Sequence, residues 1–194
     1  MMELESQLAK LAELGLVLNP EITIEDLLRA EDREAFIAKP FMLLLFLLGG
    51  EVERKPWGRR ICNRVWSFDL ECFDLECIAT TGDYVKIVRK LCLLTGNEDR
   101  LTEIVDYIDL EDGECWLKYT IGDKRQHWTI EVNDDWADML ALSYVMEDIQ
   151  GDGCQFYAID SSEAMIILYL DRSSAEKLSD LCNEDLEPLI PVEG

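Results

Sequence analysis

The hydrophobic positions of the first fifty residues follow the spacing of helices. Leucines recur three or four residues apart from Leu4 to Leu14, and the glycine that follows predicts the end of a first helix. The sequence TIED at 23–26 resembles a capping box that opens a second helix, and a further helical stretch reaches Ala38. The apolar run FMLLLFLL at 41–48 is too short for a membrane span, which needs about twenty residues. We therefore expect a helical N-terminal subregion over residues 1–50 and no membrane partner.

Residues 61–72 change to a period of two, which predicts a half-buried strand. One face of this strand would carry Cys62, Trp66, Phe68, Leu70 and Cys72, and the other Asn63, Ser67, Asp69 and Glu71. The sequence TTGD at 80–83 then predicts the start of a helix. The apolar stripe of this helix consists of Tyr84, Ile87, Val88, Leu91 and Cys92.

Three alternating segments predict an antiparallel meander, at residues 104–110, 115–121 and 126–132. Asp112-Gly113 and Gly122-Asp123 are turn sequences between these strands. Two-residue loops at both turns place the apolar residues on one shared face, which supports the register. The cross-strand pairs would then be Leu110 with Cys115, Ile108 with Leu117, Asp106 with Tyr119, Tyr119 with Gln126, and Leu117 with Trp128.

The remainder of the chain continues with helices and strands. A helix is expected from Asn133 through Met146, because acidic residues in its first turn suit the positive end of the helix dipole. Two strands follow at 155–159 and 164–170, then a helix that a capping box opens at Ser173 and a tail from Pro188. We predict a single α+β domain over 1–194, with an antiparallel meander sheet packed against helices and a sheet-containing core over 61–187.

The chain carries a formal net charge of −23, and most of it lies after residue 60. Residues 1–60 hold 11 acids and 8 bases, whereas residues 61–194 hold 30 acids and 10 bases. Such a surface repels nucleic acid and anionic membranes and attracts basic proteins. The charge therefore indicates a basic protein partner; the alternatives are solubility alone or an acid-rich proteome.

The seven cysteines are spaced irregularly, and several lie in apolar runs, as Cys92 does in LCLL. This pattern predicts reduced thiols in the cytoplasm, and the N-terminal sequence has no signal-peptide pattern. The single histidine, His127, would share the polar face of its strand with Lys118 and Thr129. Because Cys115 lies on the apolar face, a dyad of Cys115 and His127 is not expected, and a dyad with another cysteine stays open.

The pentapeptide FDLEC occurs twice in succession at 68–77. A shift of five residues reverses the face of a strand and turns a helix position by roughly 140°, so the two copies cannot be structural equivalents. Cys72 and Cys77 lack the usual ligand spacing, so we expect no metal site. A bulge or turn at Cys72-Phe73 would instead expose four candidate binding residues, Asp69, Glu71, Asp74 and Glu76.

Two further groups of residues could line a cleft. Asp106 interrupts an apolar series and should face Tyr119, so its carboxylate needs a hydrogen bond or a raised pKa. A structural hydrogen bond or an open sheet face would explain Asp106 equally. The second group could bind a cation, act as acid and base, or cap a helix start. Its members are Asp134, Asp135, Trp136 and Asp138.

Residues 54–64 contain the main basic cluster, with five of the eighteen bases and Trp57 among them. We expect this cluster to dock against acidic residues of the same chain; stacking of Trp57 on a nucleotide base is the alternative. No phosphate-binding loop, nucleophile elbow, dinucleotide fingerprint or HExxH motif is present, so no cofactor is expected.

The stretch GDKRQHWTIEVNDDWADM at 122–139, with the predicted meander and the later strand pair, resembles small bacterial immunity proteins of toxin–immunity systems. The resemblance covers roughly 70 residues in layout and carries over no functional residues. It implies a cytoplasmic protein that binds and blocks a toxin domain, often a basic nuclease. The charge fits independently, because an acidic face can cover a basic active site and dock quickly.

Three functions are therefore open. The first, which we favour, is a non-enzymatic binding protein, and specifically an immunity protein against a basic toxin domain. The second is a metal-dependent or acid–base enzyme with a cleft at Asp106 and Tyr119 or at residues 134–138. The third is a DNA-mimic inhibitor, whose carboxylates would be spaced like phosphates along one face.

Overall fold

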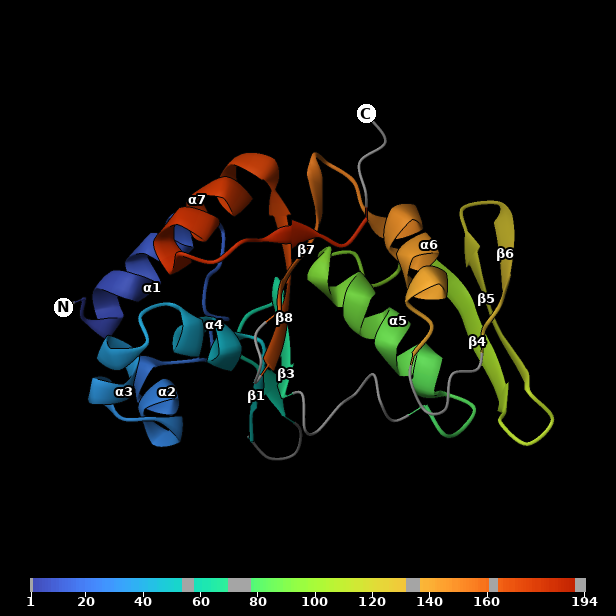
Figure 1. Cartoon of the computed structure of the whole chain (residues 1–194), viewed down its shortest axis with the longest axis horizontal. Coiled ribbons are helices and arrows are strands. Elements are labelled where there is room, and N and C mark those ends of the chain that lie inside the picture. The colour runs from blue at the N-terminus through green and yellow to red at the C-terminus, as the bar shows by residue number, and fades with distance from the viewer. Residues whose placement is uncertain (1, 54–57, 70–77, 132–136, 161–163, 191–194) are drawn as a thin grey trace. The chain divides into compact units, whose positions relative to one another are not determined.

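The computed structural model describes residues 2–53, 58–69, 78–131, 137–160 and 164–190. Its helices and antiparallel sheets confirm the predicted α+β class, and helices fill the N-terminal region (Figure 1). The chain divides into two compact units. We call Met1–Leu70 with Gly153–Leu189 the helical unit, and Glu71–Asp152 with Ile190–Gly194 the meander unit. That the two units form a single domain stays a prediction.

The described part of the helical unit contains an antiparallel sheet in the order β3-β8-β7-β9. Its strands are β3 (Val65–Asp69), β8 (Ala164–Asp171), β7 (Cys154–Asp160) and β9 (Glu187–Pro188). A two-stranded ribbon consists of β1 (Glu51–Val52) and β2 (Arg59–Arg60). The helices are α1 (Leu4–Glu13), α2 (Ile24–Ala30), α3 (Arg33–Ala38), α4 (Met42–Leu48) and α7 (Arg172–Cys182).

One face of this sheet and the helices share a hydrophobic core. The strands contribute alternate residues to it, namely Tyr157, Ile159, Ile166, Leu168 and Leu170. The helices contribute residues at helical spacing, among them Leu4, Leu11, Leu27, Leu44, Leu45 and Leu48. The leucine spacing therefore predicted the first helix correctly, and the apolar run at 41–48 is the buried helix α4.

Helix α4 ends against strand β3, where Gly49 permits a close approach. A Cβ atom at Gly49 would lie closer than 3.0 Å to the backbone nitrogen, Cβ and Oγ of Ser67. The Ser67 hydroxyl donates a hydrogen bond to the carbonyl of Phe46 in α4. Val65, on the same side of the strand, is 0% exposed. The predicted polar face is therefore wrong at Ser67, which α4 partly covers, whereas Asn63 is exposed as predicted.

A buried glutamine fixes the connection between α1 and the next helices. Gln7 is 0% exposed, and its Nε2 donates to the carbonyls of Met2 at 3.0 Å and Phe36 at 2.9 Å. Its Oε1 accepts a hydrogen bond of 2.8 Å from the amide of Phe41. Phe41 has a φ of 65°, which is uncommon for a residue other than glycine. The Gln7 side chain therefore satisfies the backbone at the point where this unusual conformation begins α4.

Two expectations for the C-terminal region need correction. Pro188 and Leu189 do not belong to a tail, because Pro188 in β9 pairs with Tyr157 in β7 and the amide of Leu189 donates to the carbonyl of Phe156 at 3.0 Å. Helix α7 begins at Arg172 rather than after Ser173. Its cap is Asp171, whose carboxylate accepts from the amide of Ser174 at 3.0 Å and from its hydroxyl at 2.7 Å. Asp171 therefore caps the first turn two residues earlier than the expected Ser173.

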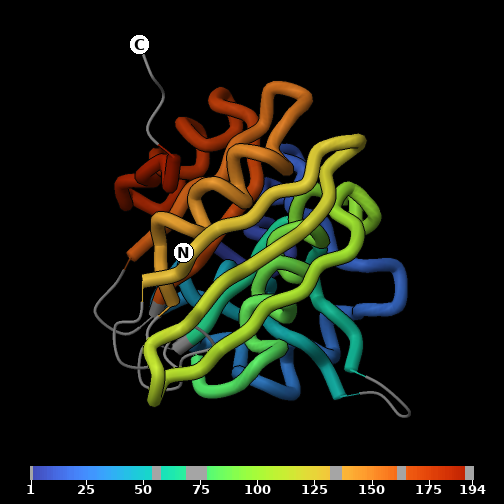
Figure 2. Tube along the Cα trace, turned by 90° about the vertical axis from the view of Figure 1, so that its right-hand side faces the viewer, coloured from blue at the N-terminus to red at the C-terminus, as the bar shows by residue number. Residues whose placement is uncertain are grey.

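The meander unit contains the three-stranded sheet β4-β5-β6, with helices on one face and the other face open (Figures 1 and 2). Its strands are β4 (Leu101–Asp109), β5 (Glu114–Ile121) and β6 (Lys124–Thr129). Its helices are α5 (Asp83–Leu94) and α6 (Met139–Ile149). The predicted meander and the helix that follows TTGD are confirmed, and the predicted stripe of α5 is buried.

The second hairpin has the predicted register, in which Tyr119 pairs with Gln126 and Leu117 with Trp128. The first hairpin does not, because Asp106 pairs with Leu117 rather than with Tyr119. Its loop is longer than two residues because the Asp109 carboxylate accepts hydrogen bonds from the two amides at 111 and 112, at 3.1 and 3.0 Å. The register shifts by two residues, which preserves the face of every side chain.

Helix α6 begins later than predicted. It starts at Met139, whereas the sequence suggested a start at Asn133. The N-cap is Asp138, whose carboxylate accepts from the amides of Leu140 at 2.9 Å and Ala141 at 3.1 Å.

The structure also bears on two further predictions, the absence of a membrane span and the reduced state of the cysteines. Among the described helices, none is long and apolar enough to cross a membrane. The cysteines that the structure describes are free thiols, namely Cys62, Cys92, Cys115, Cys154 and Cys182. Burial raises the pKa of the Cys92 thiol to about 11, so this side chain stays protonated at neutral pH.

Candidate binding surface

The carboxylate of Asp106 binds the first turn of a helix that is distant in the sequence. Asp106 is 6% exposed, and it accepts hydrogen bonds from the amides of Gly82 at 2.6 Å, Tyr84 at 2.9 Å and Val85 at 3.3 Å. These are free amides at the N-terminus of α5, where a negative charge also suits the helix dipole. Asp106 is therefore a structural cap for α5, and its predicted pairing with Tyr119 was wrong.

Tyr119 instead contacts helix α6. Its hydroxyl donates to Asp148 Oδ2 at 2.7 Å and accepts from Trp128 Nε1 at 2.9 Å. Gln126 Nε2 also donates to Asp148, at 3.2 Å. Burial, followed by the hydrogen bond to Asp148, raises the pKa of Tyr119, so the hydroxyl stays protonated and works as a donor. This network joins the sheet to α6.

The Asp138 carboxylate also binds backbone amides. Besides capping α6, its Oδ2 accepts from the amide of Glu131 at 2.9 Å. The amide of Asp138 donates to the hydroxyl of Tyr84 at 2.6 Å. Burial raises the pKa of Tyr84 to about 12. Asp106 and Asp138 thus belong to the frame of the meander unit, and the geometry does not bring Tyr119 to either carboxylate.

Several candidates lie outside the described residues. These are the side chain of Asp69 and the whole of Glu71, Asp74, Glu76, Asp134, Asp135 and Trp136, together with the expected break at Cys72-Phe73.

In the basic cluster, Arg59 Nε lies 2.8 Å from Glu21 Oε2, as the predicted docking on this chain's own acids requires. Arg60 Nη2 donates to the carbonyl of Val65 at 3.1 Å.

The sheet of the meander unit presents an open face that sequence reasoning did not identify as a candidate. We define the outer sheet face by five neighbouring side chains that alternation places on it: Val105, Tyr107, Trp116, Lys118 and His127. Val105 is 48% exposed and Tyr107 is 37% exposed. The signal was present in the sequence, because the predicted strand register places Tyr107 and Trp116 on the same face as Lys118 and His127.

The aromatic residues of the outer sheet face contact one another. The rings of Tyr107 and Trp116 stack with centroids 5.8 Å apart and an interplanar angle of 22°. His127 meets Trp116 edge-on at 5.9 Å, and Lys118 Nζ lies 3.8 Å from the centroid of a Trp116 ring. Trp116 therefore already contacts a cation of its own chain, which shows that its ring is placed for cation–π contact. His127 is exposed and Cys115 is buried on the opposite face, as predicted.

An acidic loop lies at one end of this face. We define the acidic hairpin loop by the four carboxylates that join β4 to β5, namely Asp109, Glu111, Asp112 and Glu114. The Tyr107 hydroxyl donates to Asp109 Oδ2 at 3.4 Å. The charge of Asp109 raises the pKa of Tyr107, so the hydroxyl is neutral at physiological pH. Aromatic surface and negative charge are thus adjacent.

The opposite end of the outer sheet face is a shallow depression of about 460 Å³. Its lining includes Glu103, Val105, Lys118, Thr120, Arg125 and His127. Arg125 Nη2 lies 3.4 Å from Glu103 Oε2, and the Thr120 hydroxyl donates to the same oxygen at 2.9 Å. The charges of Glu103 and Arg125 at this end are therefore partly neutralised within the chain, and the negative charge beside the face lies at the acidic hairpin loop.

Comparisons with known proteins add no assignment. The sequence matches no protein-family model, and no curated protein or solved structure matches it significantly. Within the part of the chain that the structure describes, no three His, Cys, Asp or Glu side chains are grouped to hold a metal ion.

Proposed function

We propose that this chain is a non-enzymatic binding protein that docks a basic protein on the outer sheet face and the acidic hairpin loop. The observation that supports this most is the stack of the exposed Tyr107 on the half-buried Trp116, beside four carboxylates. Tyrosine and tryptophan supply much of the binding energy at protein interfaces. Carboxylates at the border would attract basic side chains and raise the rate of encounter.

The hydrogen bonds of the candidate carboxylates favour a binding function over catalysis. Asp106 and Asp138 accept hydrogen bonds from backbone amides at helix N-termini, where a carboxylate stabilises the fold as an ion. An acid–base role would require each of them to exchange protons with a substrate. In the acidic hairpin loop, by contrast, Glu111, Asp112 and Glu114 are exposed to solvent.

The outer sheet face also fits the docking of a basic protein better than it fits a DNA mimic. A mimic needs carboxylates spread along a face at phosphate spacing, whereas Lys118 and His127 lie in the middle of the outer sheet face. The resemblance to immunity proteins makes a basic toxin domain our preferred partner, bound in the cytoplasm so that its active site is covered. The net charge of −23 supports the same partner class.

The first prediction concerns capture from a native lysate of the source cells. Wild-type protein should retain a basic protein at low salt and release it at high salt, because exposed charge attraction is screened. The double variant Tyr107→Ala/Trp116→Ala should lose at least about 90% of that protein, since hot-spot truncation costs about 2 kcal/mol or more. Bound proteins are quantified by mass spectrometry.

A matched pair of variants separates local charge from total charge. Glu111→Gln/Asp112→Asn should weaken capture at low salt, whereas Glu98→Gln/Asp99→Asn removes the same charge at exposed residues away from the face and should not. Circular dichroism confirms that each variant is folded. The proposal is wrong if no basic protein is retained at low salt, or if the aromatic double variant retains it as well as the wild type does.

A further inference from the structure

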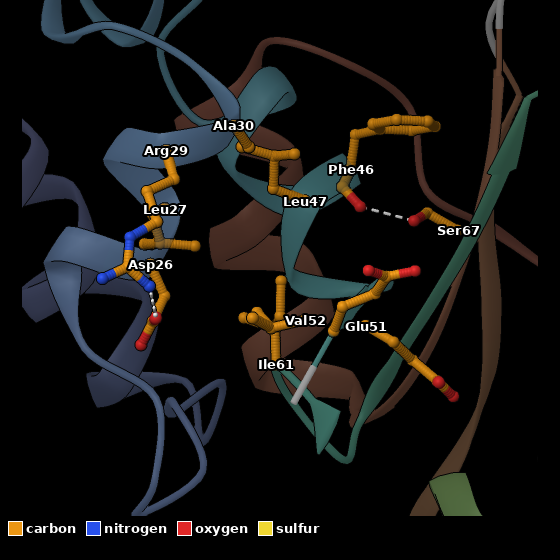
Figure 3. Close-up of a pocket in the computed structure, with 12 residues that line it drawn as sticks. Asp26, Leu27, Arg29, Ala30, Phe46, Leu47, Glu51, Val52, Ile61 and Ser67 are labelled. Carbon is orange, nitrogen blue, oxygen red and sulfur yellow. Dashed lines mark hydrogen bonds and ion pairs between the residues drawn. The ribbon is translucent and has the colours of Figure 1, made fainter. Parts of the chain in front are cut away.

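The helical unit contains a pocket of about 370 Å³ between helix α2, helix α4 and the β1–β2 ribbon. Its apolar walls are formed by Leu27, Ala30, Phe46, Leu47, Val52 and Ile61. Figure 3 shows Leu27, Leu47, Val52 and Ile61 gathered around the space. The volume lies at the lower end of the range for ligand pockets, which is about 300–1,000 Å³. It suits a small molecule with one ring or a short aliphatic chain.

Two of the polar groups at this pocket are already engaged. Asp26 Oδ1 lies 3.0 Å from Arg29 Nη1, and Asp26 Oδ2 accepts from the amide of Thr23 at 2.9 Å. On the other side, the Ser67 hydroxyl donates to the carbonyl of Phe46 (Figure 3). Neither Asp26 nor Ser67 is therefore the principal group for a ligand.

Arg29 also lines the pocket, as the ion-pair partner of Asp26, and the other charged groups there are carboxylates. Glu51 and Glu53 both line it and are both exposed to solvent. The Glu51 carboxylate lies beside Gly58, where an added Cβ atom would lie 2.5 Å from Glu51 Oε2. A side chain at Gly58 would therefore displace this flexible carboxylate. The pocket thus combines apolar walls with negative charge at its edge.

We propose that this pocket binds a small organic cation, namely a protonated amine on an aliphatic or aromatic body. The body would lose its contact with water against Leu27, Leu47 and Ile61, which is favourable for apolar surface. The ammonium group would pair with Glu51, at the edge where water still solvates both charges. A carboxylate on the same body would be repelled by Glu51 and Glu53. The site lies in the helical unit and does not depend on the proposed function of the outer sheet face.

Two ligands of similar shape and opposite charge test this proposal. Phenethylammonium and 3-phenylpropionate share a phenyl ring on a short chain, and titrations of the full chain followed by NMR chemical shifts give both affinities. Phenethylammonium should bind about fivefold to tenfold more tightly, as one attractive charge pair near a protein surface implies. Equal affinities, or tighter binding of the carboxylate, would overturn the proposal.

Three variants assign the effect to this pocket. Glu51→Gln should remove most of the preference for the cation, whereas Glu13→Gln, an exposed acid on α1, should leave it unchanged. Gly58→Ala should also weaken cation binding, because the Glu51 carboxylate must move. Ala30→Phe places a ring at the pocket from an exposed position and should abolish binding of the amine. Retention of full affinity by both Glu51→Gln and Ala30→Phe would place the ligand elsewhere and refute the assignment.

Discussion

Replacing Asp106 by alanine is expected to destabilise the protein by about 3 kcal/mol, because three backbone amides at the start of α5 lose a buried charged acceptor. Asp106→Asn keeps one acceptor oxygen but loses the charge, so its cost should be smaller, roughly half. Urea unfolding followed by circular dichroism gives the free energies of unfolding. Hydrogen exchange at the amides of Tyr84 and Val85 should be faster in both variants.

A control for Asp106 exists in the same sheet. Asp123 lies exposed in the turn between β5 and β6, and Asp123→Ala should change the free energy of unfolding by less than about 0.5 kcal/mol. A cost below about 1 kcal/mol for Asp106→Ala would contradict the capping role, since buried amides without an acceptor are costly. It would also return Asp106 to the candidates for a functional role.

Gly49→Ala is the second substitution with a large expected effect. The new methyl group would meet the backbone and side chain of Ser67 in β3, and neither backbone can move without separating α4 from the sheet. Overpacking of a core costs about 1–3 kcal/mol, and a clash with backbone belongs at the upper end, so we expect a loss of about 3 kcal/mol. Thermal and urea unfolding measure it.

The adjacent glycine supplies the control. At Gly50 the nearest atom to an added Cβ is the carbonyl oxygen of Leu47, at 3.4 Å, which is ordinary contact. Gly50→Ala makes the same chemical change one residue later, and its effect should stay within about 1 kcal/mol in either direction. Equal losses for both variants would show that helix termination, rather than the approach of α4 to β3, requires these glycines.

Local patterns predicted those elements whose signals lie within a few residues. The leucine spacing of α1 and the turn of the second hairpin depend on neighbours in the sequence, and the structure agrees with both. The predicted register of the first hairpin was wrong because the Asp109 carboxylate binds two amides of its own loop, which is longer than two residues. The prediction that Ser67 lies on an exposed face of β3 was wrong because α4 packs against this residue.

The candidate site was harder to predict, for a different physical reason. The role of Asp106 depends on the N-terminus of α5, more than twenty residues away in the chain, and no local pattern contains that contact. Asp148 accepts the hydrogen bond of the Tyr119 hydroxyl, but it lies in a mostly apolar helix and no local pattern marks it as a partner of Tyr119. Strand parity could have placed Tyr107 and Trp116 on the outer face of the sheet, since they alternate with the buried residues Ile108 and Cys115.

The two faces of the β4–β5–β6 sheet carry separate tasks, and this has a consequence for how such a protein can evolve. Residues that hold the unit together, such as Leu117 and Tyr119, point toward α5 and α6, whereas Tyr107 and Trp116 point away. Drift at the outward positions alters what the surface recognises at almost no cost to folding. A lineage could thus exchange one partner for another while keeping the same scaffold, and diversity among descendants would concentrate on alternate residues of these strands.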